Sequence, residues 1–322
     1  MSDLIPAFDF TRVFVTPWTE GAQSFGWIAL MGFFVAASCG LIGNYLILRR
    51  MALVGDAISH SILPGIAIAF LLAGSRNTWV MFFGALAAGI LTTVIIEVIH
   101  KRTRVKQDAA IGIAFTTLFA IGVVIISLYA DKVDLDQECV LYGEIGFVWM
   151  APVAQLGSLV LGPEPVVRMG LVALVTAALI ALFYKELLVS SFDPGLAASV
   201  GINASVMHYA LMSMLSIVVV SAFEAVGAIL VIAMLILPGA TASLLSQRLS
   251  VVLGLSVAHG ALSSLLGIHL AVWLDCSTAA AMVVMGTVLF TLAWVFSPRS
   301  GLLARWFAHR IVVPALEVAH GR

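Results

Sequence analysis

Residues 55–65 read Gly-Asp-Ala-Ile-Ser-His-Ser-Ile-Leu-Pro-Gly, and they place a carboxylate and an imidazole inside a stretch that is otherwise suited to lipid. Asp56 and His60 are four positions apart, so they share one face of a helix and could bind one cation together. An acidic side chain near the centre of a bilayer costs roughly 2.5–3.5 kcal/mol even on lenient insertion scales, so it needs a polar partner there. A divalent metal ion in transit is the leading hypothesis for this partner.

A second interpretation of the pair stays open, in which Asp56 contacts His60 or Ser59 and merely helps two helices to pack. If Arg50 marks the cytoplasmic surface, His60 lies about ten residues deeper, which is roughly 15 Å and close to the middle of the hydrocarbon core. Oxygen and imidazole donors together suit Mn²⁺, Fe²⁺ and Zn²⁺ rather than Cu⁺. We therefore predict a transient site for a transported ion and no tightly bound cofactor.

The composition of the chain as a whole is that of a membrane protein. Of its 322 residues, 62% are hydrophobic and 10% are charged, and the mean hydropathy is +1.12. Soluble domains carry about 25% charged residues, so this chain is expected to cross the lipid bilayer several times. No basic patch is interleaved with aromatic residues, so a nucleic-acid partner is not expected.

The apolar segments predict an all-α polytopic protein. Segments long enough to span a bilayer occur at 25–48, 51–74, 79–99, 109–130, 166–184, 223–246, 250–270 and 278–296. A shorter segment at 207–221 leaves eight or nine crossings possible, and nine is favoured. Residues 145–162 are broken by Pro152 and Gly157, so they are expected to form an interfacial or half-inserted segment. The expected organisation is an external segment 1–24, a transmembrane domain 25–298 and a cytoplasmic tail 299–322.

The basic residues favour nine crossings with an external N-terminus. In that arrangement the lysines and arginines that fall outside are only Arg12, Arg76, Lys132 and Arg168, out of 16 in the chain. Omitting segment 207–221 would reverse the last three helices and would place Arg248 and the basic tail on the wrong side. The charge distribution therefore supports counting the short segment as a crossing.

A short sequence echo predicts two interrupted helices. Residues 62–65, Ile-Leu-Pro-Gly, recur at 236–239 on two helices that are expected to run in opposite directions. Pro64 with Gly65 and Pro238 with Gly239 are therefore candidate helix breaks, where unwound backbone would offer carbonyl oxygens to an ion. A four-residue match in a chain rich in Ile and Leu could equally be accidental, so the inverted repeat is one of two interpretations.

Four other ionisable residues lie in or beside apolar segments and are weaker candidates. Glu224 lies at the outer end of 223–246, where it could be the first carboxylate that a cation meets or an end charge that faces water. His259 and His269 are on one helix, and His208 lies near the inner end of its segment. A lone histidine on an apolar helix is usually a hydrogen-bonded packing residue, so packing is the favoured interpretation of all three.

Residues 191–201, Ser-Phe-Asp-Pro-Gly-Leu-Ala-Ala-Ser-Val-Gly, predict a short capped helix between two membrane spans on the inner side. Asp193 can accept hydrogen bonds as the N-cap, Pro194 fits the first helical position and Gly201 can end the helix. A short helix that is exposed to the cytoplasm and carries small residues suits docking into a groove of a partner. A plain connecting helix is the alternative.

Several catalytic motifs are absent from the sequence. There is no Gly-x4-Gly-Lys-Ser/Thr, so the chain cannot hydrolyse ATP through a P-loop. There is also no His-Glu-x2-His and no Gly-x-Ser-x-Gly, which argues against a metalloprotease or a lipase-like hydrolase. We therefore expect a transport subunit rather than an enzyme.

Four stretches, which follow one another in the same order along nearly the whole chain, resemble the membrane permeases of bacterial ABC importers for manganese, zinc and iron. They are 49–65 with its Gly-Asp-x2-Ser-His-x2-Leu-Pro-Gly pattern, 192–201, 225–242 and 296–301. The first is quite specific and the others moderately so. The sequences of 224–242 and 269–282 resemble the manganese/iron branch of these permeases more closely than the zinc branch.

The resemblance implies a multi-pass permease of a bacterial inner membrane, with a fold like that of the vitamin B12 importer and a second permease protomer, identical or different. It implies two cytoplasmic ABC ATPase subunits and an extracytoplasmic metal-binding protein as partners. It also implies that Asp56 and His60 belong to the translocation path, whereas no role for Glu224 is carried over. Segment 192–201 would be the helix that couples to the ATPase, through Phe192, Asp193, Pro194, Ala197 and Gly201.

Two other functions remain as alternatives. The first is a metal or cation carrier that is driven by an ion gradient and works alone, and it would transport into liposomes that lack any ATPase. The second is a structural or assembly protein of the membrane, in which Asp56 and His60 join helices. Tolerance of Asp56→Asn and His60→Gln in uptake assays would favour the second.

Overall fold

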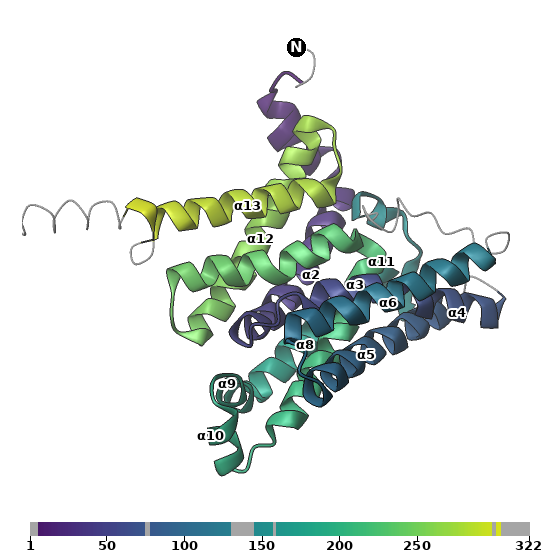
Figure 1. The fold of residues 1–322 in the computed structure, drawn as a ribbon. Helices are drawn as coiled ribbons and strands as arrows, with labels where there is room; N and C mark the ends of the chain where they lie inside the picture. The colour runs from purple at the N-terminus through teal and green to yellow at the C-terminus, as the bar shows by residue number, and fades with distance from the viewer. Residues whose placement is uncertain (1–5, 75–77, 130–144, 157–158, 298–300, 304–322) are drawn as a thin grey trace, which may run out of the picture.

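The computed structural model describes residues 6–74, 78–129, 145–156, 159–297 and 301–303. This part of the chain is a bundle of long helices with one small two-stranded hairpin (Figure 1). Its elements in chain order are the π-helical turn η1 (Thr11–Val15), α1 (Thr16–Thr19), α2 (Ala22–Leu48), α3 (Val54–Ser61), α4 (Leu63–Ala73), α5 (Thr78–Arg102), α6 (Gln107–Leu128), the 3-10 helix η3 (Ile145–Met150), β1 (Val153–Leu156), β2 (Leu159–Pro163), α8 (Glu164–Leu182), α9 (Tyr184–Phe192), α10 (Pro194–Ser199), α11 (Ala204–Leu245), α12 (Leu249–Leu274) and α13 (Thr278–Phe296).

The prediction of an all-α polytopic membrane protein is confirmed. Within the described residues, eight helical segments are long and apolar enough to cross a membrane, and one further apolar helix, Ile229–Leu245, is shorter. Segment 207–221 was predicted to be the short one, and this is wrong, because it belongs to the full-length span Ala204–Phe223. Ile229–Leu245 would extend about 26 Å, close to the hydrocarbon thickness of about 30 Å, so counting it gives the nine crossings that the basic residues favour.

Helix α2 lies at the centre of the bundle and contacts α8, α11 and α12 (Figure 1). Its contact with α11 is very close at Gly43, where a Cβ atom would overlap the carbonyl oxygen of Leu235. Small residues at such crossings let helix backbones approach closely. Close van der Waals contact then drives helix association, because lipid is as apolar as the side chains and provides no hydrophobic driving force. Any larger residue at position 43 would therefore push α11 away from the core.

Helix α11 reverses direction at Gly227. This glycine has φ 72° and ψ 169°, a conformation that is essentially restricted to glycine, whereas the backbone on both sides is helical. The first half of α11 starts beside Arg49, at the carboxyl end of α2, because His208 contacts Arg49 there. The second half returns alongside α2 to the same end, with Gly239 against Ile47.

The expected helix break at Pro238 and Gly239 is wrong. The second half of α11 is helical through both residues up to Leu245, and Pro238 packs against Gly40 of α2. A proline inside a helix removes one hydrogen bond, here to the carbonyl of Met234, without necessarily ending the helix. The backbone is also helical at 62–65, where Ile62 has φ −73° and ψ −19° and Pro64 lies in the first turn of α4, so neither copy of the sequence echo unwinds its helix.

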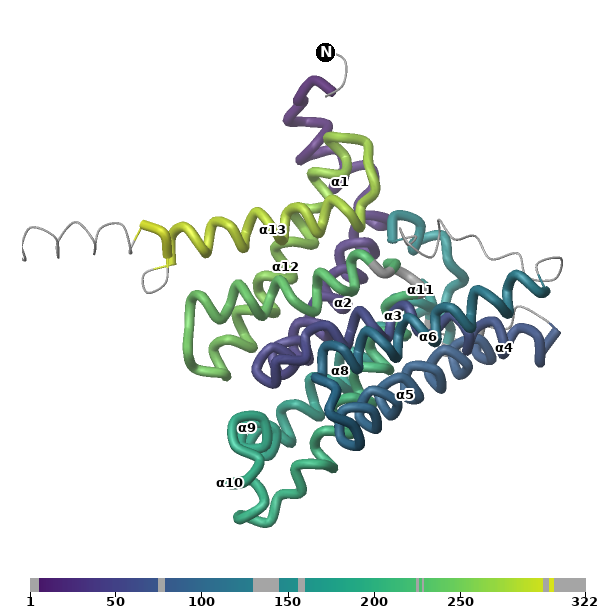
Figure 2. The backbone as a smooth tube through the Cα atoms, viewed as in Figure 1, coloured from purple at the N-terminus to yellow at the C-terminus, as the bar shows by residue number. Residues whose placement is uncertain are grey.

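Residues 145–162 contain no membrane-spanning helix in their described part, as expected for a segment that does not cross. They form η3 and most of the antiparallel β1–β2 hairpin, which has a bulge between Ala154 and Gln155. Gly162 packs against Trp27 near the start of α2, so the hairpin lies at the end of the bundle where α2 begins. Helices α9 and α10 project at the opposite end (Figure 2).

Candidate functional site

Helix α3 is buried in the bundle except on the face that carries Asp56 and His60. It packs against α5, α6 and α11. Its buried residues are Val54, Gly55, Ala57, Ile58, Ser59 and Ser61. The side chains of Asp56 and His60 are 35% and 37% exposed. The two ionisable groups therefore occupy the open face of this helix, where a lipid-facing helix would carry apolar side chains.

The two side chains are close enough to bind one ion. The Nε2 atom of His60 lies 3.3 Å from Oδ1 of Asp56. A metal ion about 2.1 Å from each of these atoms would subtend an angle of roughly 104°, which lies between octahedral and tetrahedral values. The spacing therefore suits a cation with one oxygen and one nitrogen ligand from this helix.

The pair lies near the middle of the bundle. Ile58, which lies between the two residues in sequence, packs against Gly89 of α5: a Cβ atom added to Gly89 would lie 3.4 Å from Cγ2 of Ile58. Gly89 is near the midpoint of α5. The rings of Phe115 and Phe119 on α6 each lie 6.1 Å from the His60 ring. An ion between Asp56 and His60 would thus be held at mid-depth, beside aromatic side chains of a neighbouring helix.

The alternative in which the pair helps two helices to pack depends on His60, whose ring lies beside Phe115 and Phe119 of α6. Asp56 and His60 belong to the same helix, so their contact joins no second element. The hydroxyl of Ser59 donates to the carbonyl of Gly55 at 3.1 Å and not to Asp56. Their geometry therefore leaves ligand-binding capacity on the open side of the helix.

The helix break expected at Pro64 and Gly65 is wrong, because Ile62 between α3 and α4 has the helical torsions φ −73° and ψ −19°, and Pro64 and Gly65 both lie in the first turn of α4. Helix α3 ends at Ser61 and α4 begins at Leu63, with Pro64 as its second residue. Pro64 has no amide hydrogen to donate to the carbonyl oxygen of His60, four residues earlier. Gly65 has a different role from the one expected, because it packs directly against the backbone of Gly84 on α5.

Two other candidate ligands, His259 and His269, have partners elsewhere in the bundle. The backbone of Glu224 lies in α11, three residues before Gly227, but its side chain is outside the described part. His259 is buried, and its Nε2 lies 3.1 Å from the carbonyl oxygen of Gly286. The Nδ1 atom of His269 lies 2.8 Å from the carbonyl oxygen of Val13. Among the described residues, no cluster of three or more His, Cys, Asp or Glu side chains could hold a metal.

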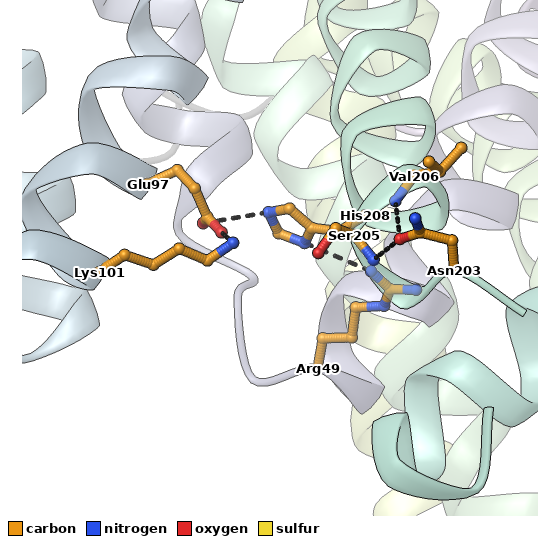
Figure 3. A network of polar contacts seen from close by, with 7 residues as sticks. All are labelled: Arg49, Glu97, Lys101, Asn203, Ser205, Val206 and His208. Atoms are coloured by element: carbon orange, nitrogen blue, oxygen red, sulfur yellow. Dashed lines mark hydrogen bonds and ion pairs between the residues drawn. The ribbon is translucent and has the colours of Figure 1, made fainter. Parts of the chain in front are cut away.

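A second polar cluster, which we call the Arg49 cluster, lies near α9, because Arg49 donates hydrogen bonds to Ser190 and Ser191 of that helix. Figure 3 shows four of its members, Arg49, Glu97, Lys101 and His208. The Nε2 atom of His208 lies 3.2 Å from Oε2 of Glu97. The other carboxylate oxygen of Glu97, Oε1, forms an ion pair with Nζ of Lys101 at 2.6 Å. The guanidinium of Arg49 lies 3.4 Å from Nδ1 of His208. The cluster comprises Arg49, Glu97, Lys101, Ser190, Ser191 and His208.

Only one tautomer of His208 satisfies both of its contacts. Arginine has donors and no acceptor, so Nδ1 of His208 must accept from Arg49. The ring proton is then on Nε2 and is donated to Glu97. Burial of Arg49 lowers the pKa of its guanidinium from the ordinary value, because the charged form loses water. The cluster is thus an ordered set of donors and acceptors, with its charges opposite each other.

Glu97 is a member of this cluster that was not predicted from the sequence. This acidic side chain lies in an otherwise apolar helix, and only 10% of it is exposed. The available signal was an acidic residue four positions before Lys101, a spacing that brings opposite charges together on a helix. His208 is a packing histidine, as favoured, but its partners are charged side chains.

Helix α10 has the caps that the sequence predicts. Oδ1 of Asp193 accepts hydrogen bonds from the amides of Gly195 and Leu196 at 2.9 and 3.0 Å, and Pro194 is the first helical residue. Gly201 ends the segment with a φ of +85°. Ala197 is fully buried, so it faces into the protein.

The outer face of this region is apolar and open. Phe192, Leu196 and Val200 are 65%, 53% and 67% exposed. They lie at the end of the bundle beside the Arg49 cluster, because Ser190 and Ser191 belong to the last turn of α9. Such exposed apolar side chains on a short helix are typical of an interaction surface.

These features define a multi-pass membrane transport protein, with a polar site inside the bundle and an apolar helix at one end. The chain belongs to the ABC 3 transport family, whose profile matches residues 23–297. The "Manganese transport system membrane protein MntD" of Bacillus subtilis (strain 168) is 44% identical over 87% of this chain and 94% of the relative. The "Zinc transport system membrane protein TroD" of Treponema pallidum (strain Nichols) is 41% identical over 90% of this chain and 79% of that protein.

A solved structure is also similar to this chain. "PsaBC from Streptococcus pneumoniae in complex with Fab" has 30% sequence identity and a TM-score of 0.74, covering 92% of this chain and the whole of that one. The predicted resemblance to metal-importer permeases is therefore confirmed, and the protein is a multi-pass transport subunit of the cytoplasmic membrane.

Proposed function

We propose that this protein is the permease subunit of an ATP-driven importer of divalent transition-metal ions, in which Asp56 and His60 hold the ion in transit. The observation that carries the proposal is the open Asp56–His60 pair at mid-depth in the bundle. Oxygen and imidazole ligands suit manganese, iron and zinc alike. Manganese or iron is the favoured substrate and zinc the next, because stretches 224–242 and 269–282 resemble the manganese/iron branch more closely than the zinc branch.

The pair supplies two ligands, so the ion keeps further partners during transit. Mn²⁺ and Fe²⁺ accept more than two ligands, and water or the carbonyl oxygen of His60 can fill positions beside the Asp56 carboxylate. A second permease protomer that turns the same face toward a shared passage would add its own pair. Weak and incomplete coordination is an advantage for transport, since the ion must leave as readily as it enters.

Energy comes from separate ABC ATPase subunits that bind the apolar surface of Phe192, Leu196 and Val200. Asp193, Pro194 and Gly201 shape this segment, and Ala197 anchors it to the bundle. ATP binding moves α10 and rocks two permease protomers to alternate access. An extracytoplasmic binding protein delivers the metal near the external segment 1–24, and residues 299–322 form a cytoplasmic tail that follows the transmembrane domain 25–298.

The experiment that tests this function is reconstitution of the full chain in proteoliposomes with its ATPase subunits and binding protein. We expect ATP-dependent uptake of radioactive Mn²⁺, and competition by unlabelled Mn²⁺, Fe²⁺ and Zn²⁺ in that assay ranks the three ions. The matched control contains the same permease without the ATPase and should show no uptake. Uptake in that control, driven by an ion gradient, would identify a stand-alone carrier and would contradict the proposal.

A further inference from the structure

Arg49 connects the proposed coupling segment to the body of the bundle. Its Nε donates to the hydroxyl of Ser191 at 3.0 Å, and one terminal nitrogen donates to the hydroxyl of Ser190 at 3.1 Å. Both serines lie in the last turn of α9, directly before Asp193, the N-cap of α10. A displacement of α10 therefore pulls on the guanidinium of Arg49.

The chain leads from Arg49 to α3 through a tight turn. The amide of Met51 donates to the carbonyl of Leu46 at 2.8 Å, and the amide of Val54 donates to the carbonyl of Met51 at 3.1 Å. Met51 and Val54 are also buried. Because the turn is hydrogen-bonded and packed, movement of Arg49 is passed to the first residue of α3 rather than absorbed by a loose loop.

A second connection runs through α5 and reaches the same helix. Arg49 contacts His208, and His208 contacts Glu97 on α5. Farther along α5, Thr92 shares a buried hydrogen bond of 2.6 Å with Ser61, the last residue of α3. Both ends of α3 are thus connected to Arg49, one through the chain and one through side chains.

The side chain of arginine is needed for this arrangement. Its planar guanidinium has donors that diverge, so it can contact Ser190, Ser191 and His208 at the same time. A lysine carries one compact ammonium group and could keep the charge, but it cannot make three contacts in these directions. The neighbouring Arg50 is exposed and offers a matched comparison.

We infer that Arg49 is the positioning residue that transmits movement of α9 and α10 to the helix carrying Asp56 and His60. Arg49 does not touch the ion. It holds α3 in register with the coupling segment, so that the open face of Asp56 and His60 changes its environment when α10 moves. The inference rests on the proposed function for the source of the movement.

The test uses the full transporter complex in nanodiscs and measures backbone hydrogen exchange with and without a non-hydrolysable ATP analogue. In the wild-type complex we expect nucleotide to change exchange at 194–199 and also at 50–61. In Arg49→Lys we expect the change at 194–199 to persist and the change at 50–61 to fall at least fivefold. Arg50→Lys should behave as wild type. The double variant Ser190→Ala, Ser191→Ala removes the acceptors and should reproduce Arg49→Lys.

A second measurement separates transmission from folding. In proteoliposomes, Arg49→Lys should lower the number of Mn²⁺ ions moved per ATP hydrolysed at least fivefold, while complex yield and ATP hydrolysis stay within twofold of wild type. A purely structural role would lower yield and leave this ratio unchanged in the complexes that assemble, which would overturn the inference. Adding the serine substitutions to Arg49→Lys should cause no further loss.

The outcomes for the two proposals differ. Nucleotide-dependent exchange at 50–61 that survives in Arg49→Lys, or that is missing in the wild type, overturns the inference whatever the substrate is. A wild-type complex that shows this exchange change and its loss in Arg49→Lys, but moves no Mn²⁺, Fe²⁺ or Zn²⁺, supports the inference and refutes the metal substrate.

Discussion

The bundle contains two polar regions that differ in how far their side chains are satisfied by the protein itself. Asp56 and His60 come from one helix, contact each other and leave about a third of each side chain exposed. The Arg49 cluster joins four elements, and its carboxylate at Glu97 is 10% exposed with cations or donors on both oxygens. Both regions contain a carboxylate and an imidazole, yet their surroundings are opposite.

This difference separates a ligand site from a connection. A buried charge is tolerated when neighbouring groups satisfy it, and such a group has little capacity left for a ligand. The Arg49 cluster has used its donors and acceptors on α2, α5, α9 and α11, so it fixes these elements relative to one another. The open pair has unused lone pairs that only an ion, water or a second protomer can satisfy. The predictions below test this division.

The largest expected effect is on transport, from Asp56→Ala. Losing outer-shell groups costs metal sites roughly 10–100-fold, so losing a direct ligand should lower ATP-dependent Mn²⁺ uptake by at least about 100-fold. Assembly with the ATPase should be unchanged, because the ion-pair partner of Asp56 is His60 on the same helix, far from the exposed surface of α10. Ser59→Ala is the control, since its hydroxyl bonds within α3, and its uptake should stay within about twofold of wild type. Equal uptake rates for both variants would refute the site.

The largest expected effect on stability comes from the closed region, through Glu97→Ala. Removing one partner of a buried ion pair costs roughly 3–5 kcal/mol, and about 3 kcal/mol is expected here because Lys101, 53% exposed, can turn to water. Denaturant unfolding in detergent measures this. Asp108→Ala removes an exposed acid from the start of α6 and should cost less than about 1 kcal/mol. If the two variants unfold alike, the cluster does not hold the bundle together.

Much of this architecture could be predicted from the sequence because its signals are local. Long apolar segments define the spans, and the four-residue spacing of Asp56 and His60 puts them on one face of α3. The N-cap at Asp193 was also predictable, since an aspartate followed by proline satisfies the first amides of a helix without distant partners.

The features that were missed depend on contacts between distant segments. Glu97 resembles an end charge until His208, more than a hundred residues away, is placed against it. The turn within α11 is at Gly227, a few residues beyond the boundary predicted between segments 207–221 and 223–246, and the separate break predicted at Pro238 is absent. A glycine reveals nothing of its φ angle until the fold fixes it, and many glycines here serve close packing instead.

Gly227→Ala tests the element that both polar regions share. Before this turn α11 supplies His208 to the Arg49 cluster, and beyond it Leu235 packs against Gly55 of α3. Forcing alanine into this backbone region costs about 1–3 kcal/mol. Gly26→Ala is the matched substitution in a helix with open space around it, and it should raise stability by about 0.5–1 kcal/mol. Unfolding in detergent measures both, and the same sign for both would show that Gly227 is not a strained turn.

The smallest expected effect lies at the edge of the closed region, in Asp193→Ala. Loss of an N-cap costs about 1 kcal/mol, so hydrogen exchange of the amides in α10 should become about fivefold faster. Asn203→Ala removes an equivalent pair of bonds from the start of α11 and should leave exchange in α10 unchanged. Unchanged exchange in Asp193→Ala would mean that the buried Ala197 alone keeps α10 folded. The exposed Leu196 and Val200 would then be presented to a partner by packing on the bundle, and the cap would have no part in shaping the surface.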